Sequence, residues 1–335
     1  MRTPSFWYPA DRRWAGVLPW LLMPVSLVVQ LAARIRQRVV SPYHAPVPVI
    51  CVGNLTVGGA GKTPAVLALV AMLAARGIQV HCLSRGYGGR LPGPLRVDPA
   101  KHTAAQVGDE PLLLARAAPA WISRNRKRGA MAAVAAGAEL LLLDDGHQNP
   151  SIAKDVSLLL IDPARCLGNG WTLPSGPLRE SLPHGLSRAT AVLLTGSGDC
   201  AAVQHAAQQR GIPVLHAEKQ AIDGAALSEK RLFAFSGIAV PEQFFDMLVS
   251  FGVNLVGSKR FSDHHPYTDS ELIAMFTKAG LADAELITTE KDSVRLPPQV
   301  RERVLTLGIK MQFTDPDALL KVLAPALSRL KVGGA

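Results

Sequence analysis

The stretch that decides the fold spans residues 49–63 and reads VICVGNLTVGGAGKT. Its apolar start, residues 49–52, predicts a buried strand, and the following residues 64–76 predict a helix with Pro64 in its first turn. A glycine-rich turn ending in Gly-Lys-Thr lies between them. The backbone N–H groups of such a turn converge on phosphate oxygens, the lysine reaches the terminal phosphates, and the threonine hydroxyl can ligate Mg²⁺. The stretch therefore predicts a binding site for a nucleoside triphosphate.

The predicted phosphate contacts extend over the whole turn. They comprise Thr56, Val57, Gly58, Gly59, Ala60, Gly61, Lys62 and Thr63. The pattern G-x-x-x-x-G-K-[ST] has glycine where this chain has Thr56, and the neighbouring Gly58 and Gly59 can supply the flexibility instead. A glycine-rich turn that binds nothing is the alternative, and the position of Gly-Lys-Thr between a strand and a helix argues against it.

The composition is that of a folded protein with an anionic partner. A length of 335 residues predicts about two domains, and 48% hydrophobic residues suffice for substantial cores. The formal net charge of +10 favours nucleic acid, acidic lipid or a phosphorylated substrate, and does not choose among them. The four cysteines (Cys51, Cys82, Cys166 and Cys200) are scattered without a C-x-x-C pair. We expect reduced thiols in a cytosolic setting and neither zinc nor a disulfide framework.

Residues 1–42 differ from the rest of the chain. Residues 15–33 carry no charged side chain, and Arg34, Arg36 and Arg38 follow them. We favour an amphipathic interfacial helix that dips into the cytoplasmic leaflet, with the arginines facing anionic lipid. Aromatic side chains at the headgroups would be Trp7, Tyr8, Trp14 and Trp20. A helix packed on the next domain and a membrane-spanning helix are the alternatives. A cleaved signal peptide is disfavoured, since no small-residue cleavage site follows the apolar run.

From residue 47 onward, apolar strands alternate with helices, which is typical of a parallel sheet with crossover helices. We expect an α/β fold in which residues 43–225 form a mostly parallel sheet like that of P-loop NTPases. A locally polar stretch around residues 220–230 marks the expected boundary. Residues 226–335 are expected to form a second, smaller α/β domain that includes a final helix over residues 315–330.

A second motif, ELLLLDDGHQ at residues 139–148, is an apolar strand that ends in Asp144 and Asp145. A carboxylate at the end of such a strand is the Walker B arrangement, which holds Mg²⁺ near the threonine of the phosphate loop. Many strands end in a turn such as Asp-Gly, so the motif gains its weight from the Gly-Lys-Thr upstream.

Polar side chains also follow other predicted strands. The loop SRGYGGR at residues 84–90 offers Arg85 and Tyr87, either to a ligand or to solvent. The basic run at residues 124–128 is a solvated face or a contact for phosphate or lipid headgroups. The loop at residues 168–180 is too long for a plain connector, which is typical of a functional or mobile segment.

Two clusters could serve proton transfer. Asp109 opens a helix, where it either complements the helix dipole or acts as a carboxylate base beside the phosphate site. The segment FSDHHPYT, residues 261–268, contains His264 and His265, for which we favour a catalytic or substrate-orienting role over a structural one. A metal site is disfavoured, because two adjacent histidines cannot both point at one ion without an unusual turn. TTEKD at residues 288–292 either contacts nucleotide or caps the next segment.

Seven motifs in this order resemble the tetraacyldisaccharide 4′-kinase family, the membrane-associated lipid A kinases of Gram-negative-type bacteria. They read GNLTVGGAGKTP (53–64), SRGYGG (84–89), GDE (108–110), DDGHQ (144–148), GPLRE (176–180), DHH (263–265) and TEKD (289–292). The resemblance implies transfer of the ATP γ-phosphate to the 4′-hydroxyl of a tetraacylated glucosamine disaccharide 1-phosphate, which yields lipid IVA. It also implies ATP and Mg²⁺ as ligands and a location at the cytoplasmic face of the inner membrane, as a peripheral or monotopic protein on an anionic surface.

The resemblance also implies roles for single residues. Lys62 would take part in catalysis, with Asp109 as the general base for the sugar hydroxyl and His264 as its partner. The implied Mg²⁺ ligands are Thr63, Glu110, Asp144 and Asp145. Further side chains expected in the site are Arg85, Tyr87, Gln148, Arg179 and Glu180. Family members often carry an aromatic residue at the position of His147 and a basic residue or histidine at that of Asn149, so the contacts after the Walker B strand differ here.

Two other functions stay open on the residues alone. A membrane-recruited P-loop NTPase switch of the ParA/MinD kind also combines such a loop with a membrane-seeking helix. Those proteins carry a lysine where this chain has Val57, which counts against the switch. A nucleic-acid-binding NTPase draws only on the basic charge. We expect no nucleic acid and no obligate protein partner.

Overall fold

The computed structural model describes residues 4–8, 16–59 and 61–330. Its strands are β1 (Val49–Asn54), β2 (Val80–Ser84), β3 (Leu95–Arg96), β4 (Ala120–Ile122), β5 (Leu140–Asp144), β6 (Val156–Ile161), β7 (Ala191–Thr195), β8 (Val214–Ile222), β9 (Arg231–Ser236), β10 (Asn254–Arg260), β11 (Glu285–Thr289) and β12 (Leu305–Phe313). They form one sheet in the order β10-β9-β11-β12-β8-β7-β6-β1-β5-β2-β4-β3. Neighbouring strands are parallel except at the β8–β12 and β3–β4 pairs, so the mostly parallel α/β fold is confirmed.

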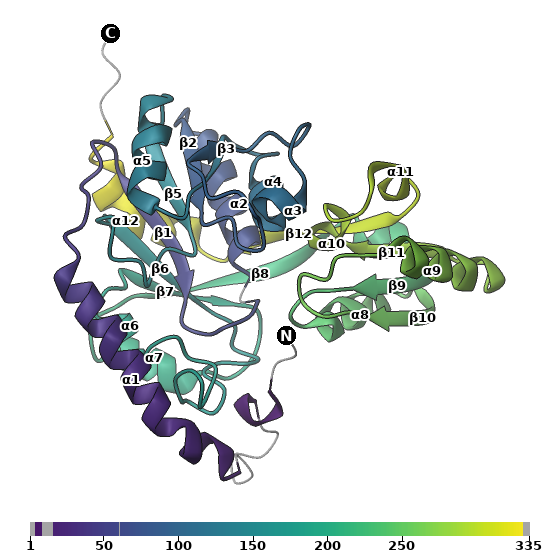
Figure 1. The fold of residues 1–335 in the computed structure, drawn as a ribbon, viewed down its shortest axis with the longest axis horizontal. Helices are drawn as coiled ribbons and strands as arrows, with labels where there is room; N and C mark the ends of the chain where they lie inside the picture. Colours follow the sequence, from purple (N-terminus) through teal and green to yellow (C-terminus); the bar gives the residue numbers. More distant parts are fainter. Residues whose placement is uncertain (1–3, 9–15, 60, 331–335) are drawn as a thin grey trace.

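The helices cover the faces and ends of this sheet (Figure 1). They are the 3₁₀ turns η1 (Ser5–Trp7) and η3 (Gly224–Leu227) and the α-helices α1 (Leu18–Val39), α2 (Lys62–Ala74), α3 (Ala104–Val107), α4 (Asp109–Leu114), α5 (Arg126–Ala135), α6 (Leu182–Leu186), α7 (Ala201–Gln208), α8 (Pro241–Ser250), α9 (Asp269–Leu281), α10 (Glu290–Ser293), α11 (Pro298–Arg301) and α12 (Pro316–Leu327).

The central strands are buried along their whole length. Every residue of β1, β5, β6 and β7 is buried, which is why their sequences are continuous apolar runs rather than alternating patterns. Helix α2 packs on one face, where Val66 and Leu69 are fully buried in the same core as Ile50. The carboxyl ends of these parallel strands therefore open on one common edge, where their loops can build a site.

Strands β8 and β12 join two parts of the molecule (Figure 1). The larger part contains β1 to β7, and the smaller part contains β9, β10 and β11. β8 pairs with β7 in the larger part and with β12, whereas β12 pairs with β11 through residues 305–307 and with β8 through residues 308–313. The sheet is therefore continuous across both parts. The division of the chain into residues 1–42, 43–225 and 226–335 stays a proposal.

The last helix does not belong to the smaller part. The sequence pattern groups a helix over residues 315–330 with the second domain, whereas the structure packs this helix on the larger part. Leu319 and Leu323 of α12 are buried in the core of the larger part, and α12 contacts β1 and β6. The chain returns along β12 before it forms α12, and Figure 1 shows this yellow helix beside the larger part.

The expectation of reduced cysteines throughout is also wrong. Cys166 and Cys200 form a disulfide, with their Cα atoms 5.5 Å apart. They are distant in sequence, but one follows β6 and the other precedes α7 directly after β7, and these strands are neighbours in the sheet. Spacing along the chain could not reveal this pair. Cys51 and Cys82 are free and buried, as apolar core residues.

Helix α1 lies along the outside of the larger part (Figure 1). Its inner face makes polar contacts with the protein: Ser26 donates to the carbonyl of Thr172, Gln30 donates to the Thr172 hydroxyl, and Gln37 contacts His184. Its outer face is apolar and exposed. The exposed side chains include Leu18, Leu21, Val25, Val28, Leu31 and Ile35. Among the described residues, α1 is the helix long and apolar enough to cross a membrane.

Candidate active site

A cavity of about 1480 Å³ lies between the carboxyl ends of the central strands and the smaller part. The larger part contributes the phosphate loop and the ends of β2 and β5. The smaller part contributes residues 238–244, 260–265 and 289–291, which follow β9, β10 and β11. The same rule places both groups, because each unit presents the carboxyl ends of its parallel strands to the cavity.

The phosphate loop turns into α2 at Gly61, whose φ of +77° favours glycine. Lys62 and Thr63 are buried but line the cavity. The Lys62 ammonium donates to Asn54 Oδ1 at 3.2 Å and lies 3.7 Å from Asp145 Oδ1. A lysine and the first N–H groups of a helix thus face the same space, which suits bound phosphate.

The structure brings most of the predicted phosphate contacts together. Val57, Gly58, Gly59, Gly61, Lys62 and Thr63 all line the cavity. Thr56 forms an isolated bridge with Leu178 instead and is absent from the lining. Ala60 lies outside the described residues, as does Trp14 of the N-terminal segment.

The two aspartates after β5 have opposite environments. Asp145 accepts two hydrogen bonds from Arg179, at 2.7 and 2.9 Å. Burial acts to raise its pKa, but the charges of Lys62 and Arg179 prevail and hold the pKa below its ordinary value. Asp144 is 1% exposed, and neither of its carboxylate oxygens has a hydrogen-bond partner among the described residues. Burial and the nearby charge of Glu110 raise the pKa of Asp144.

An orphaned buried carboxylate facing a phosphate loop fits a bound cation. Asp144 and Thr63 both line the cavity, and Glu110 lines it too. No cluster of three or more His, Cys, Asp or Glu side chains suited to a metal occurs within the described parts of the chain. Magnesium at a nucleotide needs only one or two carboxylates, since phosphate oxygens and water complete its coordination. The donor set therefore suits Mg²⁺ held together with a nucleotide.

Glu180 orients its neighbours. Its carboxylate accepts two hydrogen bonds from Arg188, at 2.7 and 2.6 Å, and one from Gln148 at 3.0 Å. Gln148 also donates to the carbonyl of Asn54 at 2.8 Å and lines the cavity, whereas Glu180 is buried behind it. Glu180 thereby links the loop after β6 to the start of the phosphate loop.

His147 is a buried side chain of the core. Its ring nitrogens lie 2.8 Å from Ser157 Oγ and 3.0 Å from the Gly185 carbonyl. Burial lowers its pKa to about 4, so the imidazole is neutral at physiological pH. The polar partners explain why histidine can stand at a buried position.

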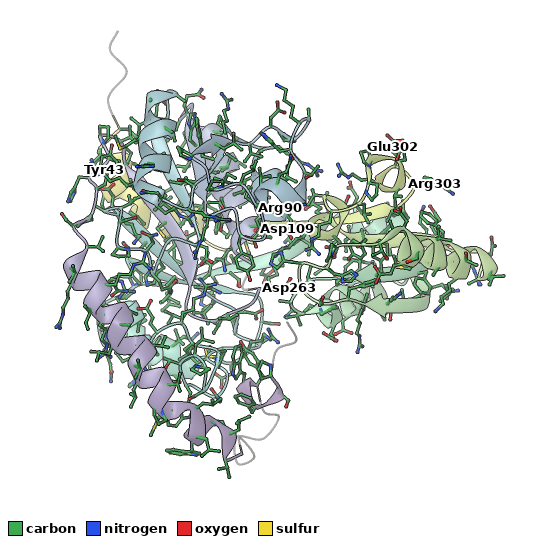
Figure 2. All side chains as sticks on the ribbon, viewed as in Figure 1. Tyr43, Arg90, Asp109, Asp263, Glu302 and Arg303 are labelled. Atoms are coloured by element: carbon green, nitrogen blue, oxygen red, sulfur yellow. A yellow bond between two sulfur atoms is a disulfide. The ribbon has the colours of Figure 1, made fainter. Side chains whose placement is uncertain are left out.

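Asp109 and His264 meet where the two parts of the molecule face each other. Nδ1 of His264 donates to Oδ2 of Asp109 at 3.0 Å across 155 residues of sequence. Figure 2 labels Asp109 on the larger part and Asp263, the neighbour of His264, on the smaller part. Burial acts to raise the pKa of Asp109, but the hydrogen bond from His264 and the charges of Lys291 and Arg295 outweigh it and hold the pKa below its ordinary value. The pairing that the family resemblance implies is thus present as a contact.

The start of α4 is held by the loop that carries Tyr87. Gly108 has a φ of +90°, and a Cβ there would collide with the carbonyl oxygen of Tyr87, so the loop lies directly on the helix start. The Tyr87 ring meets the His264 ring edge to face, with centroids 5.2 Å apart. Arg85 lines the same cavity.

Sequence reasoning missed three basic residues. Lys291 donates to Glu110 at 3.0 Å, and Arg295 contacts Asp109 across 186 residues. Arg126 is 4% exposed, lines the cavity and donates to the carbonyl oxygen of Asp144 at 3.5 Å. Lys291 stands in the quoted motif TEKD, but nothing local distinguishes Arg295, whose partner is remote in sequence. Arg126 lies in the basic run at residues 124–128, whose sequence is equally typical of a solvated surface.

Comparisons with known proteins point to one family. A family model described as Tetraacyldisaccharide-1-P 4′-kinase matches residues 18–328. The tetraacyldisaccharide 4′-kinase of Rhodospirillum centenum is 51% identical, covering 98% of this chain and 97% of that protein. The namesake of Parvibaculum lavamentivorans is 46% identical over 99% of each chain. Among solved structures, LpxK from Aquifex aeolicus, crystallised in complex with ATP, has a TM-score of 0.73 at 27% identity, covering 92% of this chain and 99% of that one.

Proposed function

The chain belongs to the tetraacyldisaccharide 4′-kinase family, and we propose from this and from its site how it carries out the reaction. It is an ATP-dependent kinase of lipid A biosynthesis. Its acceptor is the 4′-hydroxyl of a tetraacylated glucosamine disaccharide 1-phosphate, and its product is lipid IVA. The oxygen–phosphorus bond to the sugar forms as the bond between the γ-phosphate and ADP breaks.

The larger part binds the phosphate donor. Lys62 and the N–H groups at the start of α2 contact the phosphates, and Arg179 fixes Asp145 beside them. Asp144, Thr63 and Glu110 would hold Mg²⁺, which would supply positive charge to neutralise the charge that develops in phosphoryl transfer. The observation that supports this assignment is that the Asp144 oxygens have no hydrogen-bond partner in the described residues.

Asp109 is the proposed base for the sugar hydroxyl. Its Oδ2 is held by His264, whereas its Oδ1 accepts, among the described residues, only the N–H of Glu110, at 3.1 Å. Oδ1 is therefore the oxygen able to take the hydroxyl proton as the new bond forms. The contact between Asp109 and His264, which come from different parts of the molecule, is the single observation that carries this proposal.

The carboxylate of Asp109 is only 3% exposed. The acceptor hydroxyl therefore reaches Asp109 when the two parts of the molecule separate slightly, and their closure then excludes water from the transfer. Such motion is of the gating kind known in other kinases. The continuous β8–β12 connection provides a hinge for it.

The apolar outer face of α1 is the proposed membrane contact, at the cytoplasmic face of the inner membrane. Lipid would cover the exposed apolar side chains on the outer face of α1, while Ser26 and its neighbours on the inner face stay in contact with the protein. Arg34, Arg36 and Arg38 are exposed at the end of α1 and would meet anionic headgroups. The acyl chains of the acceptor would thereby stay in the leaflet while its sugar enters the site.

Exchange of Leu21, Val28 and Leu31 for glutamine should release the protein from vesicles that contain anionic lipid. The matched control exchanges Val249, Ile273 and Leu281, which are equally apolar and exposed but lie on the smaller part. Release in sedimentation assays by the first set alone supports the proposed face. Equal retention of both variants would contradict it.

The reaction itself is tested with purified protein, labelled ATP and the tetraacyl disaccharide 1-phosphate. We expect labelled lipid, and no appreciable ATP turnover without the acceptor. ATP turnover that ignores the glycolipid would instead favour the membrane-recruited NTPase switch, and salt-sensitive binding of DNA or RNA would favour a nucleic-acid partner.

A further inference from the structure

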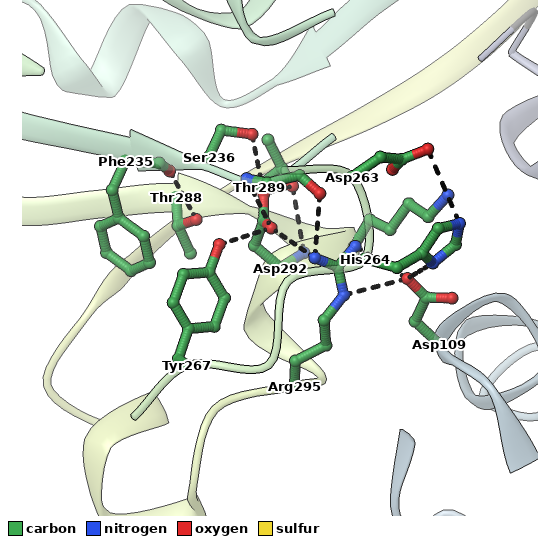
Figure 3. Close-up of polar contacts among 12 residues, drawn as sticks. Asp109, Phe235, Ser236, Asp263, His264, Tyr267, Thr288, Thr289, Asp292 and Arg295 are labelled. Carbon is green, nitrogen blue, oxygen red and sulfur yellow. Dashed lines mark hydrogen bonds and ion pairs between the residues drawn. The ribbon is translucent and has the colours of Figure 1, made fainter. Parts of the chain in front are cut away.

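Arg295 is a buried arginine that joins the proposed base to the core of the smaller part (Figure 3). Its side chain is 6% exposed. Nε and Nη2 both donate to Oδ2 of Asp109, at 3.0 and 2.8 Å. Nη1 points the other way and donates to the Gly237 carbonyl at 3.0 Å and to Asp292 Oδ1 at 2.9 Å. One guanidinium therefore bridges two carboxylates from different parts of the chain.

Asp292 fixes this guanidinium from behind. It is fully buried and accepts hydrogen bonds from the hydroxyls of Ser236, Tyr267 and Thr289, at 2.8, 2.7 and 2.7 Å. The backbone N–H of Gly237 donates to it at 2.9 Å. A planar guanidinium locked on one side presents its other donors in a fixed direction. Arg295 thus transmits the rigid geometry of the smaller part to Asp109.

The two oxygens of Asp109 are thereby made unequal. Oδ2 takes both Arg295 contacts and the His264 contact, whereas Oδ1 takes only the N–H of the adjacent Glu110 within the part of the chain that the structure describes. A carboxylate has about four lone-pair positions for acceptance, and here those of Oδ2 are occupied. Without Arg295, the carboxylate could rotate and exchange its two oxygens.

We propose that Arg295 is a positioning residue of the phosphoryl transfer: it holds Asp109 by Oδ2 so that Oδ1 remains for the acceptor hydroxyl. This inference rests on the proposed base role of Asp109. The competing role is purely structural, in which Arg295 only balances the buried charges of Asp109 and Asp292 and holds the two parts together.

The test compares Arg295→Ala with Arg295→Lys in the full-length protein, measuring kcat, KM for ATP and the thermal unfolding midpoint. Arg295→Ala should lower kcat on the order of 10²-fold with little change in KM for ATP, because the base loses its orientation and the donor site does not. Arg295→Lys should recover part of kcat, since an ammonium can replace one of the two contacts with Asp109. Added methylguanidinium should raise kcat of Arg295→Ala and leave the wild type unchanged.

Arg329→Ala is the matched control, because it removes another arginine–aspartate pair, with Asp155, outside the cavity lining. It should lower the unfolding midpoint and leave kcat unchanged. Near-normal kcat in Arg295→Ala would overturn the inference. So would a loss of kcat that neither lysine nor methylguanidinium restores and that follows the unfolding midpoint. Asp109→Ala separates the two proposals. If Asp109→Ala keeps a near-normal kcat, the base assignment of Asp109 fails. If Asp109→Ala is slow but Arg295→Ala keeps a near-normal kcat, only the positioning role of Arg295 fails.

Discussion

The donor half of the site is local in the fold, whereas the base half spans it. Lys62 and Thr63 open α2, which follows β1 through the phosphate loop, and Asp144 ends the neighbouring strand β5. Asp109 instead depends on His264 and Arg295, which lie 155 and 186 residues away and belong to the smaller part. Donor binding can therefore persist when the parts separate, and base positioning cannot. In the proposed mechanism, catalysis would therefore depend on the contact between the two parts.

The same difference explains what the sequence could predict. The phosphate loop and Asp144-Asp145 are short patterns attached to apolar strands, so both the strands and their ligand class follow from local residues. The mostly parallel sheet follows as well, because its buried strands are continuous apolar runs.

Contacts between segments that are far apart in the sequence cannot be predicted from local patterns. The Cys166–Cys200 disulfide, the return of α12 to the larger part and the role of Arg295 all depend on which elements become neighbours. No periodicity or spacing encodes that information in one sequence. The pairing of Asp109 with His264 came from the family resemblance, not from either local pattern.

The largest effect is expected from a substitution in the donor half of the site, which binds the phosphates of ATP in the proposed mechanism. Lys62→Ala should lower kcat/KM for ATP by roughly 10⁴-fold, because the lysine contacts phosphates in both the ground state and the transition state. Steady-state kinetics measures the loss of kcat/KM for ATP, and ATP-binding calorimetry measures the loss of affinity for ATP. Lys154→Ala is the control, since that lysine donates to the backbone carbonyls of His147 and Asn149 and is not part of the cavity lining. ATP binding that survives in Lys62→Ala would place the donor phosphates elsewhere.

Next in size is a change that separates the two halves. Asp109→Asn should lower kcat on the order of 10³-fold with ATP affinity largely intact, because it removes the proton acceptor and leaves the phosphate loop unchanged. Asp155→Asn, which alters a structural aspartate that accepts the N–H of Val49, serves as control and should keep its rate. A near-normal rate for Asp109→Asn would refute the base assignment.

A smaller effect is expected for the histidine partner. His264→Ala should lower kcat roughly 10- to 100-fold, the value of one hydrogen bond to a charged group. His265 is the internal control: its ring contacts Glu271 at the start of α9 and not Asp109, so His265→Ala should retain most activity. Equal losses of kcat in both variants would mean that catalysis depends on the fold of the loop at residues 261–268 and not on the contact between His264 and Asp109.

The smallest effect concerns stability inside the larger part. The pKa of His147 is lowered to about 4 in the folded protein, against an ordinary value of 6.5, so the unfolded chain binds the proton first as pH falls. Stability should be unaffected by this group above pH 6.5 and decline below it, by about 2 kcal/mol between pH 7 and pH 5. Denaturant unfolding should show a smaller decline for His147→Gln, whereas His44→Gln, at an exposed position, should behave as wild type. An unchanged pH dependence in His147→Gln would show that the imidazole is accessible to protons.

The most direct measurement of the central claim, that the base is assembled across the two parts, is a double-mutant cycle on kcat. It compares Asp109→Asn, His264→Ala and the double variant, with ATP affinity measured for each. If His264 acts through Asp109, the double variant should be about as slow as Asp109→Asn alone, and ATP affinity should stay close to wild type in all three. Losses that multiply in the double variant would show that the two residues act independently and would contradict the account.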